Sequence, residues 1–125
     1  MAPRFERDRT PSGPVVQGFS GSRFVVDGER YDAVLLTPER AIAWNPPARA
    51  ELTFDHFASI LMLDPRPHFL LFGSGPTLGR LSRAVMAQIG ELGIGVEAMD
   101  SRAAARTWGV LRAEERWIVA ALMPL

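Results

Sequence analysis

Residues 68–101 read HFLLFGSGPTLGRLSRAVMAQIGELGIGVEAMDS, and this stretch decides the fold. It opens with an apolar run at 68–72, which is typical of a strand that is covered on both faces. After a glycine-containing turn, apolar residues recur every three or four positions, which predicts a helix from Pro76 to about Leu92. Residues 94–99 form a second apolar strand. A helix between two such strands indicates parallel pairing through a right-handed crossover.

The same alternation continues to the C-terminus. Asp100 or Ser101 is expected to cap an alanine-rich helix that includes Trp108 and ends near Gly109. Residues 117–123 then form a last apolar strand. The second half of the chain therefore reads strand, helix, strand, helix, strand, which is the pattern of an α/β domain.

The first half of the chain contains shorter elements. Its sharpest signal is Asp27-Gly28, a two-residue hairpin turn between β-branched and aromatic runs. The elements expected there are strands at 23–26, 29–31, 33–36 and 40–44, and a helix at 53–60 capped by Thr53. Together the two halves predict an α/β fold whose central sheet is mixed and mostly parallel, with helices and an antiparallel β-hairpin extension.

The length of 125 residues suits one domain. We expect that domain to span residues 15–125, and residues 1–14 to form a flexible N-terminal arm because they are rich in proline and charge. No apolar run approaches the ~20 residues of a membrane helix, and no secretory leader is evident. The expected location is therefore the cytoplasm, and an integral membrane protein is not expected.

Composition excludes several chemistries. The 14 basic residues balance 14 acidic ones, and all of the basic residues are Arg. Without Lys or Cys the chain cannot form Schiff bases, disulfides, thiolate zinc sites or a cysteine nucleophile. A net charge of zero argues against a nucleic-acid binder. The arginines are spread along the chain and are expected on solvated faces.

A glycine-rich turn, Gly73 to Gly79, lies between a predicted strand and a predicted helix. Such turns can hold a phosphate at a helix N-terminus, and Glu97 in the next strand could serve as a ribose-binding acid. Two features argue against a dinucleotide site: Pro76 has no backbone N–H to donate, and the sequence after this unit contains no second nucleotide-binding half. Anion binding is a milder form of this hypothesis, and the simplest interpretation is a tight turn.

No set of side chains makes a convincing catalytic centre. Ser20 lies in a near match to a nucleophile elbow, but between hairpin strands. Ser74 lies at a better place without the motif, and both His56 and His68 precede it, which is not the order of an α/β-hydrolase. No catalytic residue, metal ligand or cofactor is predicted, and whether the chain is an enzyme is left open, with the balance against it.

One sheet edge nevertheless gathers polar and flexible residues. In open α/β sheets, ligands bind outside the carboxyl ends of the strands. Two predicted parallel strands end there and would line one groove, if a groove exists, with Gly73, Ser74, Gly75, Met99, Asp100 and Ser101. The three tryptophans are expected in the core or half-buried, and an exposed one would indicate an interface.

Several segments carry a family resemblance: Phe72 to Pro76, Gly93 to Ser101, Ala104 to Leu111, Ala113 to Arg116 and Val119 to Leu122. They resemble the small-domain family that includes mitochondrial complex I assembly factor three and the adipogenesis-associated Mth938-domain-like proteins. The resemblance implies a three-layer fold around a mixed sheet. Family members often have Cys at the position of Ala105 and Tyr-Asn at Trp108-Gly109. The resemblance supplies no catalytic residues.

Two hypotheses follow. The first is a non-catalytic protein-interaction module similar to a respiratory complex assembly factor, a monomer or weak dimer with protein partners. The second is a small-ligand or anion-binding protein, or a weak enzyme, that uses the groove at the carboxyl ends of the parallel strands. An exposed apolar or Arg-rimmed patch would favour the first hypothesis, and a concave pocket at the groove, with free backbone N–H groups at the helix start, would favour the second.

Overall fold

The computed structural model describes residues 13–125. The predicted arm therefore lies outside the described residues, except for Gly13 and Pro14. Pro14 is buried, and its carbonyl accepts a hydrogen bond of 2.9 Å from the indole Nε1 of Trp108. The part of the chain that packs on the domain thus includes Pro14.

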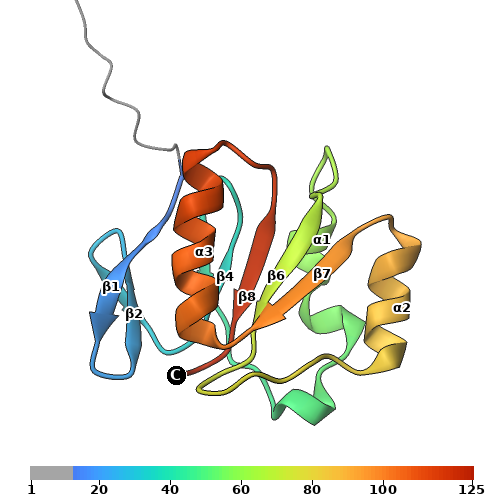
Figure 1. Cartoon of the computed structure of the whole chain (residues 1–125), viewed down its shortest axis with the longest axis horizontal. Helices are drawn as coiled ribbons and strands as arrows, with labels where there is room; N and C mark the ends of the chain where they lie inside the picture. The colour runs from blue at the N-terminus through green and yellow to red at the C-terminus, as the bar shows by residue number, and fades with distance from the viewer. Residues whose placement is uncertain (1–12) are drawn as a thin grey trace, which may run out of the picture.

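Within residues 13–125, eight strands and three α-helices form the domain (Figure 1). In chain order they are β1 (Val16–Ser20), β2 (Arg23–Val26), β3 (Glu29–Tyr31), β4 (Val34–Leu36), β5 (Ala41–Ala43), α1 (Ala58–Leu61), β6 (Phe69–Gly73), α2 (Arg83–Glu91), β7 (Gly95–Met99), α3 (Ser101–Ala113) and β8 (Val119–Leu122). Two 3₁₀ turns, Arg49–Glu51 and Phe54–His56, precede α1.

The strands form two sheets. The small sheet is antiparallel with the order β1-β2-β3, and the central sheet has the order β5-β4-β8-β6-β7. Strand β6 pairs in parallel with β7 and β8, whereas β4 pairs antiparallel with β5 and β8. The predicted mixed α/β fold is confirmed, and β4 and β5 belong to the central sheet instead of the hairpin extension.

Side chains of the central strands alternate between two apolar clusters. In β6, Leu70 and Phe72 join the cluster beneath α1 and α2, while Leu71 joins the cluster beneath α3 and the small sheet. Figure 1 shows α3 and the β1–β2 ribbon on one side of the sheet and α1 behind it. Three layers result, with the central sheet in the middle.

The helix predicted from Pro76 begins only at Arg83, where Ser82 caps it and accepts from the Val85 N–H. The segment between folds as a loop, because the Ser74 hydroxyl accepts from the Gly79 N–H and satisfies backbone that a helix would otherwise use. Leu78, predicted on the inner face, is 60% exposed.

Two further expectations were wrong. Gly109 does not end α3, which continues to Ala113. Arg112 is not on a solvated face: it is 5% exposed, and its guanidinium donates to the Arg116 carbonyl at the end of the helix. A cation at a helix C-terminus is favoured by the exposed carbonyls there. The region 53–60 is helical but divided between the turn Phe54–His56 and α1.

Candidate functional site

The six residues predicted at the sheet edge lie together where β6 and β7 end. The Ser74 N–H donates to the Met99 carbonyl at 2.9 Å, and the Ser101 N–H donates to the Gly75 carbonyl at 2.8 Å. The two strand ends are thus joined by main-chain bonds that continue beyond the parallel ladder. The C-terminal end of β8 is tied to the same place, because the Met123 N–H donates to the Gly73 carbonyl at 2.9 Å.

Ser101 is the centre of this cluster. It is fully buried, and its hydroxyl accepts from the Gly75 N–H and donates to the Met123 carbonyl, each at 2.8 Å. One side chain therefore satisfies two buried main-chain groups from two different strand ends. Such groups are costly to leave unpaired.

The two neighbouring glycines fit the tight packing. A Cβ on Gly73 would lie 2.8 Å from the Leu122 Cδ2 and 2.9 Å from the Ser101 Oγ. Gly75 has φ +106°, a backbone conformation that side-chain-bearing residues rarely adopt. Both positions therefore require glycine for structural reasons.

The remaining polar atoms of the cluster also have partners within the chain. The Ser74 hydroxyl donates to the Thr77 carbonyl at 2.7 Å, and the Asp100 carboxylate accepts from the Ala103 N–H at 2.9 Å as the cap of α3. The Met99 sulfur accepts from the Thr107 hydroxyl at 3.4 Å. A ligand at this edge would compete with these bonds, and a binding role for the six residues stays a prediction.

The conditions for a nucleotide site are not met at the glycine-rich turn. The turn does not open a helix, since α2 begins at Arg83, so no helix N-terminus points at the turn from that side. Glu97 is exposed in the middle of β7, which is the outermost strand of the central sheet. His56 has a local structural role, because its Nδ1 accepts a hydrogen bond from the Thr53 N–H at the start of a 3₁₀ turn. Within residues 13–125, no group of three His, Asp or Glu side chains could hold a metal ion.

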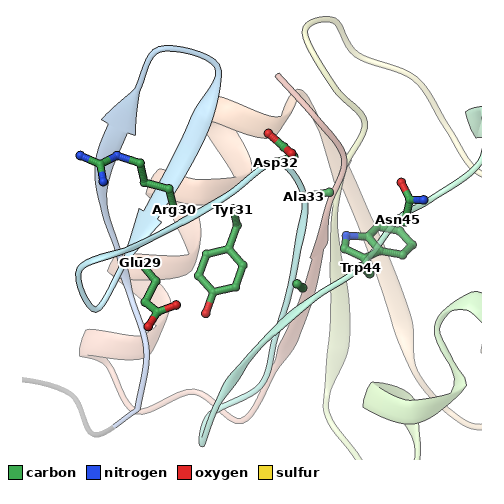
Figure 2. Close-up of a pocket in the computed structure, with 8 residues that line it drawn as sticks. Glu29, Arg30, Tyr31, Asp32, Ala33, Trp44 and Asn45 are labelled. Atoms are coloured by element: carbon green, nitrogen blue, oxygen red, sulfur yellow. The ribbon is translucent and has the colours of Figure 1, made fainter.

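A cavity of about 540 Å³ lies elsewhere, between the small sheet and the edge of the central sheet (Figure 2). Its wall on one side comes from β3 and the link after it, and its wall on the other side comes from β5 and the residues that follow. The lining residues are Glu29, Arg30, Tyr31, Asp32, Ala33, Ala43, Trp44 and Asn45. The volume is in the range of ligand pockets, which is about 300–1,000 Å³.

The aromatic walls of this cavity are fixed by the core. The Trp44 indole donates to the Leu122 carbonyl at 3.1 Å and packs against the Phe57 ring, with 5.9 Å between ring centroids. Tyr31 is half-buried against the cluster beneath α3. Tyr and Trp held in place by packing are enriched among residues that carry binding energy.

Charge in the cavity leans acidic. Figure 2 shows the Arg30 side chain pointing away from Trp44 and Asn45, and its Nε donates to the Ser20 hydroxyl at 3.2 Å. Glu29 and Asp32 line the cavity, and Asp32 is paired with Arg23 at 3.1 Å. Both members of that pair are largely exposed, so the pair is weak.

The sequence pattern did not reveal this cavity. The strands at 29–31 and 40–44 were expected, and an exposed Trp was expected to indicate an interface, but the pattern gave no reason to place β3 beside β5. The cavity arises because β3 and β5 are edge strands of different sheets, and the Tyr31 and Trp44 rings pack into the two different apolar clusters.

A family model described as "Protein of unknown function (DUF498/DUF598)" matches residues 16–123. The chain belongs to this family. Among solved structures, it is similar to a Bordetella parapertussis protein, with a TM-score of 0.82 and 31% identity over 91% of this chain and 98% of that one. It is also similar to a Bordetella pertussis protein described as a Mth938-like domain, with a TM-score of 0.77 and 25% identity over 99% of this chain and 92% of that one.

Among sequences, the chain is 31% identical over 116 residues to NADH dehydrogenase [ubiquinone] 1 alpha subcomplex assembly factor 3 of Bos taurus, covering 92% of this chain and 63% of that protein. The chain thus spans less than two thirds of the length of that relative. It is 28% identical to an uncharacterized Rhodobacter capsulatus protein, over 88% of this chain and 84% of that protein. No helix within the described residues is long and apolar enough to cross a membrane.

Proposed function

We propose that the chain is a non-catalytic protein-interaction module that assists the assembly of a respiratory complex of the NADH dehydrogenase type. The observation that carries this proposal is the similarity to an assembly factor across 92% of the chain at 31% identity. On this proposal the chain acts in the cytoplasm, as a monomer or weak dimer, by binding other proteins. It needs no catalytic residue and no cofactor.

The site geometry supports this function in two ways. At the carboxyl ends of β6 and β7, the hydroxyls of Ser74 and Ser101 are bonded within the chain. At the cavity between the sheets, the half-buried aromatic residues Tyr31 and Trp44 line the wall together with charged residues. Aromatic residues set among polar ones are typical of the centres of protein–protein interfaces.

The alternative, ligand or anion binding or weak catalysis at the cluster around Ser74 and Ser101, has less support. A ligand there would have to replace bonds of 2.7–2.8 Å that join the strand ends. The effect of Ser101→Ala on the free energy of unfolding separates these roles.

A gene deletion tests the proposed function. The expected result is less mature NADH dehydrogenase complex in membranes on a native gel, and lower NADH oxidation that depends on it. A plasmid copy of the gene should restore both. Unchanged amounts of the complex in the deletion strain would contradict the proposal.

A further inference from the structure

We propose that the cavity between β3 and β5 receives an extended segment of a partner protein, which adds as a strand and places an Arg or Lys side chain within reach of the carboxylates that line the cavity. This inference rests on the proposed function and names the surface and the kind of partner segment. It uses three properties of the cavity: open main-chain groups, the Tyr31 ring, and the carboxylates of Glu29 and Asp32.

The open main-chain groups of β5 follow from its ladder with β4. The Thr37 N–H donates to the Arg40 carbonyl and the Trp44 N–H donates to the Ala33 carbonyl, so every second residue of β5 is bonded toward β4. The N–H and C=O of Ala43 lie between these positions and point to the free edge. Ala43 is exposed and lines the cavity.

The open main-chain groups of β3 follow from its turn. Asp27 and Gly28 have φ of +51° and +81°, as in a two-residue hairpin whose closing pair is hydrogen-bonded. That closing pair is Val26 and Glu29, and hydrogen-bonded pairs alternate with open pairs along an antiparallel ladder. The N–H and C=O of Arg30 therefore point away from β2. Arg30 lines the cavity although its guanidinium is turned to Ser20, so its main chain contributes to the wall.

Two free strand edges that line one cavity match an extended peptide better than a compact ligand. A peptide in β conformation offers main-chain donors and acceptors along both of its edges, and strand addition is a common mode of peptide recognition. The other edge of the central sheet, β7, is also open and serves as a comparison edge in the experiments below.

The side chains select the residue that enters. Glu29 forms no ion pair within the described part of the chain, and Asp32 shares only an exposed pair with Arg23. A guanidinium or ammonium group in the cavity would gain these carboxylates and the face of the Tyr31 ring. An acidic side chain there would meet like charge.

A peptide titration followed by ¹H–¹⁵N NMR tests the proposal. The probe is acetylated, amidated Thr-Val-Thr-Arg-Thr-Val-Thr, and its control has Glu in place of Arg. We expect the Arg peptide to shift the amide signals of Arg30 and Ala43 and the indole signal of Trp44, and to bind about tenfold more tightly than the Glu peptide. Equal affinities would overturn the basic preference. N-acetylarginine amide that binds as tightly as the peptide would overturn the extended segment.

Two pairs of variants locate the site. Ala43→Pro removes an edge N–H without breaking the β4–β5 ladder, and Ala98→Pro does the same at the edge of β7. We expect only Ala43→Pro to weaken binding, by about tenfold or more. Glu29→Arg should reverse the preference between the peptides, whereas Glu91→Arg on α2 should not. Loss of binding in Ala98→Pro alone, or an unchanged preference in Glu29→Arg, would overturn the assignment.

These results are separate from those of the gene deletion. An assembly defect without peptide binding would refute this docking site and leave the proposed function standing. Peptide binding without an assembly defect would refute the proposed function and leave a peptide-binding cavity. Dispersed NMR spectra of each variant confirm that it is folded before its affinity is compared.

Discussion

Replacing Ser101 with Ala tests whether the strand-end cluster is structural or open to a ligand. The hydroxyl is fully buried and joins the Gly75 N–H and the Met123 carbonyl. Its removal leaves one buried donor and one buried acceptor without this partner. Each such group costs about 1–3 kcal/mol, so the free energy of unfolding should fall by about 2–6 kcal/mol.

The assay is urea unfolding followed by tryptophan fluorescence, in which buried Trp108 reports on the fold. With a slope of about 2 kcal/mol per molar urea, the midpoint should fall by about 1–3 M and the slope should stay unchanged. Ser82→Ala is the matched control. That hydroxyl caps α2 through a longer bond of 3.3 Å that is only partly buried, so its loss should cost only about 0.5–1 kcal/mol.

A small loss of stability in Ser101→Ala would refute the interpretation that the cluster is structural. If Ser101→Ala cost less than about 1 kcal/mol, as little as Ser82→Ala, the strand ends would not depend on this hydroxyl. The hydroxyl could then bind a ligand with little loss in the free energy of unfolding. Ligand binding at the edge formed by Gly73, Ser74 and Asp100 would become the stronger hypothesis.

Four other substitutions have defined outcomes. Gly73→Ala should lower the free energy of unfolding in urea by about 1–3 kcal/mol, because the new methyl would press on Leu122 and Ser101. Gly109→Ala should raise the melting temperature by about 2–4 °C, because a Cβ there meets nothing within 4 Å in the interior of α3. Trp108→Phe should cost about 2–3 kcal/mol in the same urea assay, since the bond to the Pro14 carbonyl and part of a buried ring are lost. Asp100→Ala should cost about 1 kcal/mol in thermal unfolding through the lost cap of α3, and no change in melting would contradict its capping role.

Local signals in the sequence predicted local structure well. Asp27-Gly28 forms the expected turn, and both residues have the positive φ that such a turn requires. Asp100 caps α3 as expected from its place between a strand and an alanine-rich segment. These features were predictable because their energies come from neighbours in sequence.

The start of α2 was not predictable in the same way. The spacing of apolar residues continues back to Leu78, so periodicity alone extends the helix to Pro76. The competing bonds come from Ser74, whose hydroxyl holds Thr77 and Gly79 in a loop and also reaches the Met99 carbonyl of a neighbouring strand. A hydrogen bond to a distant strand has no signature in the local pattern. Tertiary contacts therefore override the helical periodicity here.

The six residues at the strand ends could be predicted because parallel strands end at the same edge, whatever their side chains do. Whether the edge is open or closed depends on where the Ser101 hydroxyl points, and that depends on the main chain of Met123 arriving from β8. The sequence places Ser101 at the edge, but it does not show that two buried main-chain groups converge on its hydroxyl.

The cavity between the sheets follows from strand order. Only Asp32 and Ala33 separate β3 from β4, and such a short link usually joins two strands of a hairpin. Here β4 already pairs with β8 on one edge and β5 on the other, so no edge of β4 is left for β3. Strand β3 must diverge from the central sheet, with its own edge unpaired, and Tyr31 comes to line one cavity with Ala43 and Trp44. The edges of β3 and β5 are thus open because both edges of β4 are already paired. Any segment that fills the cavity as a strand would join the two sheets.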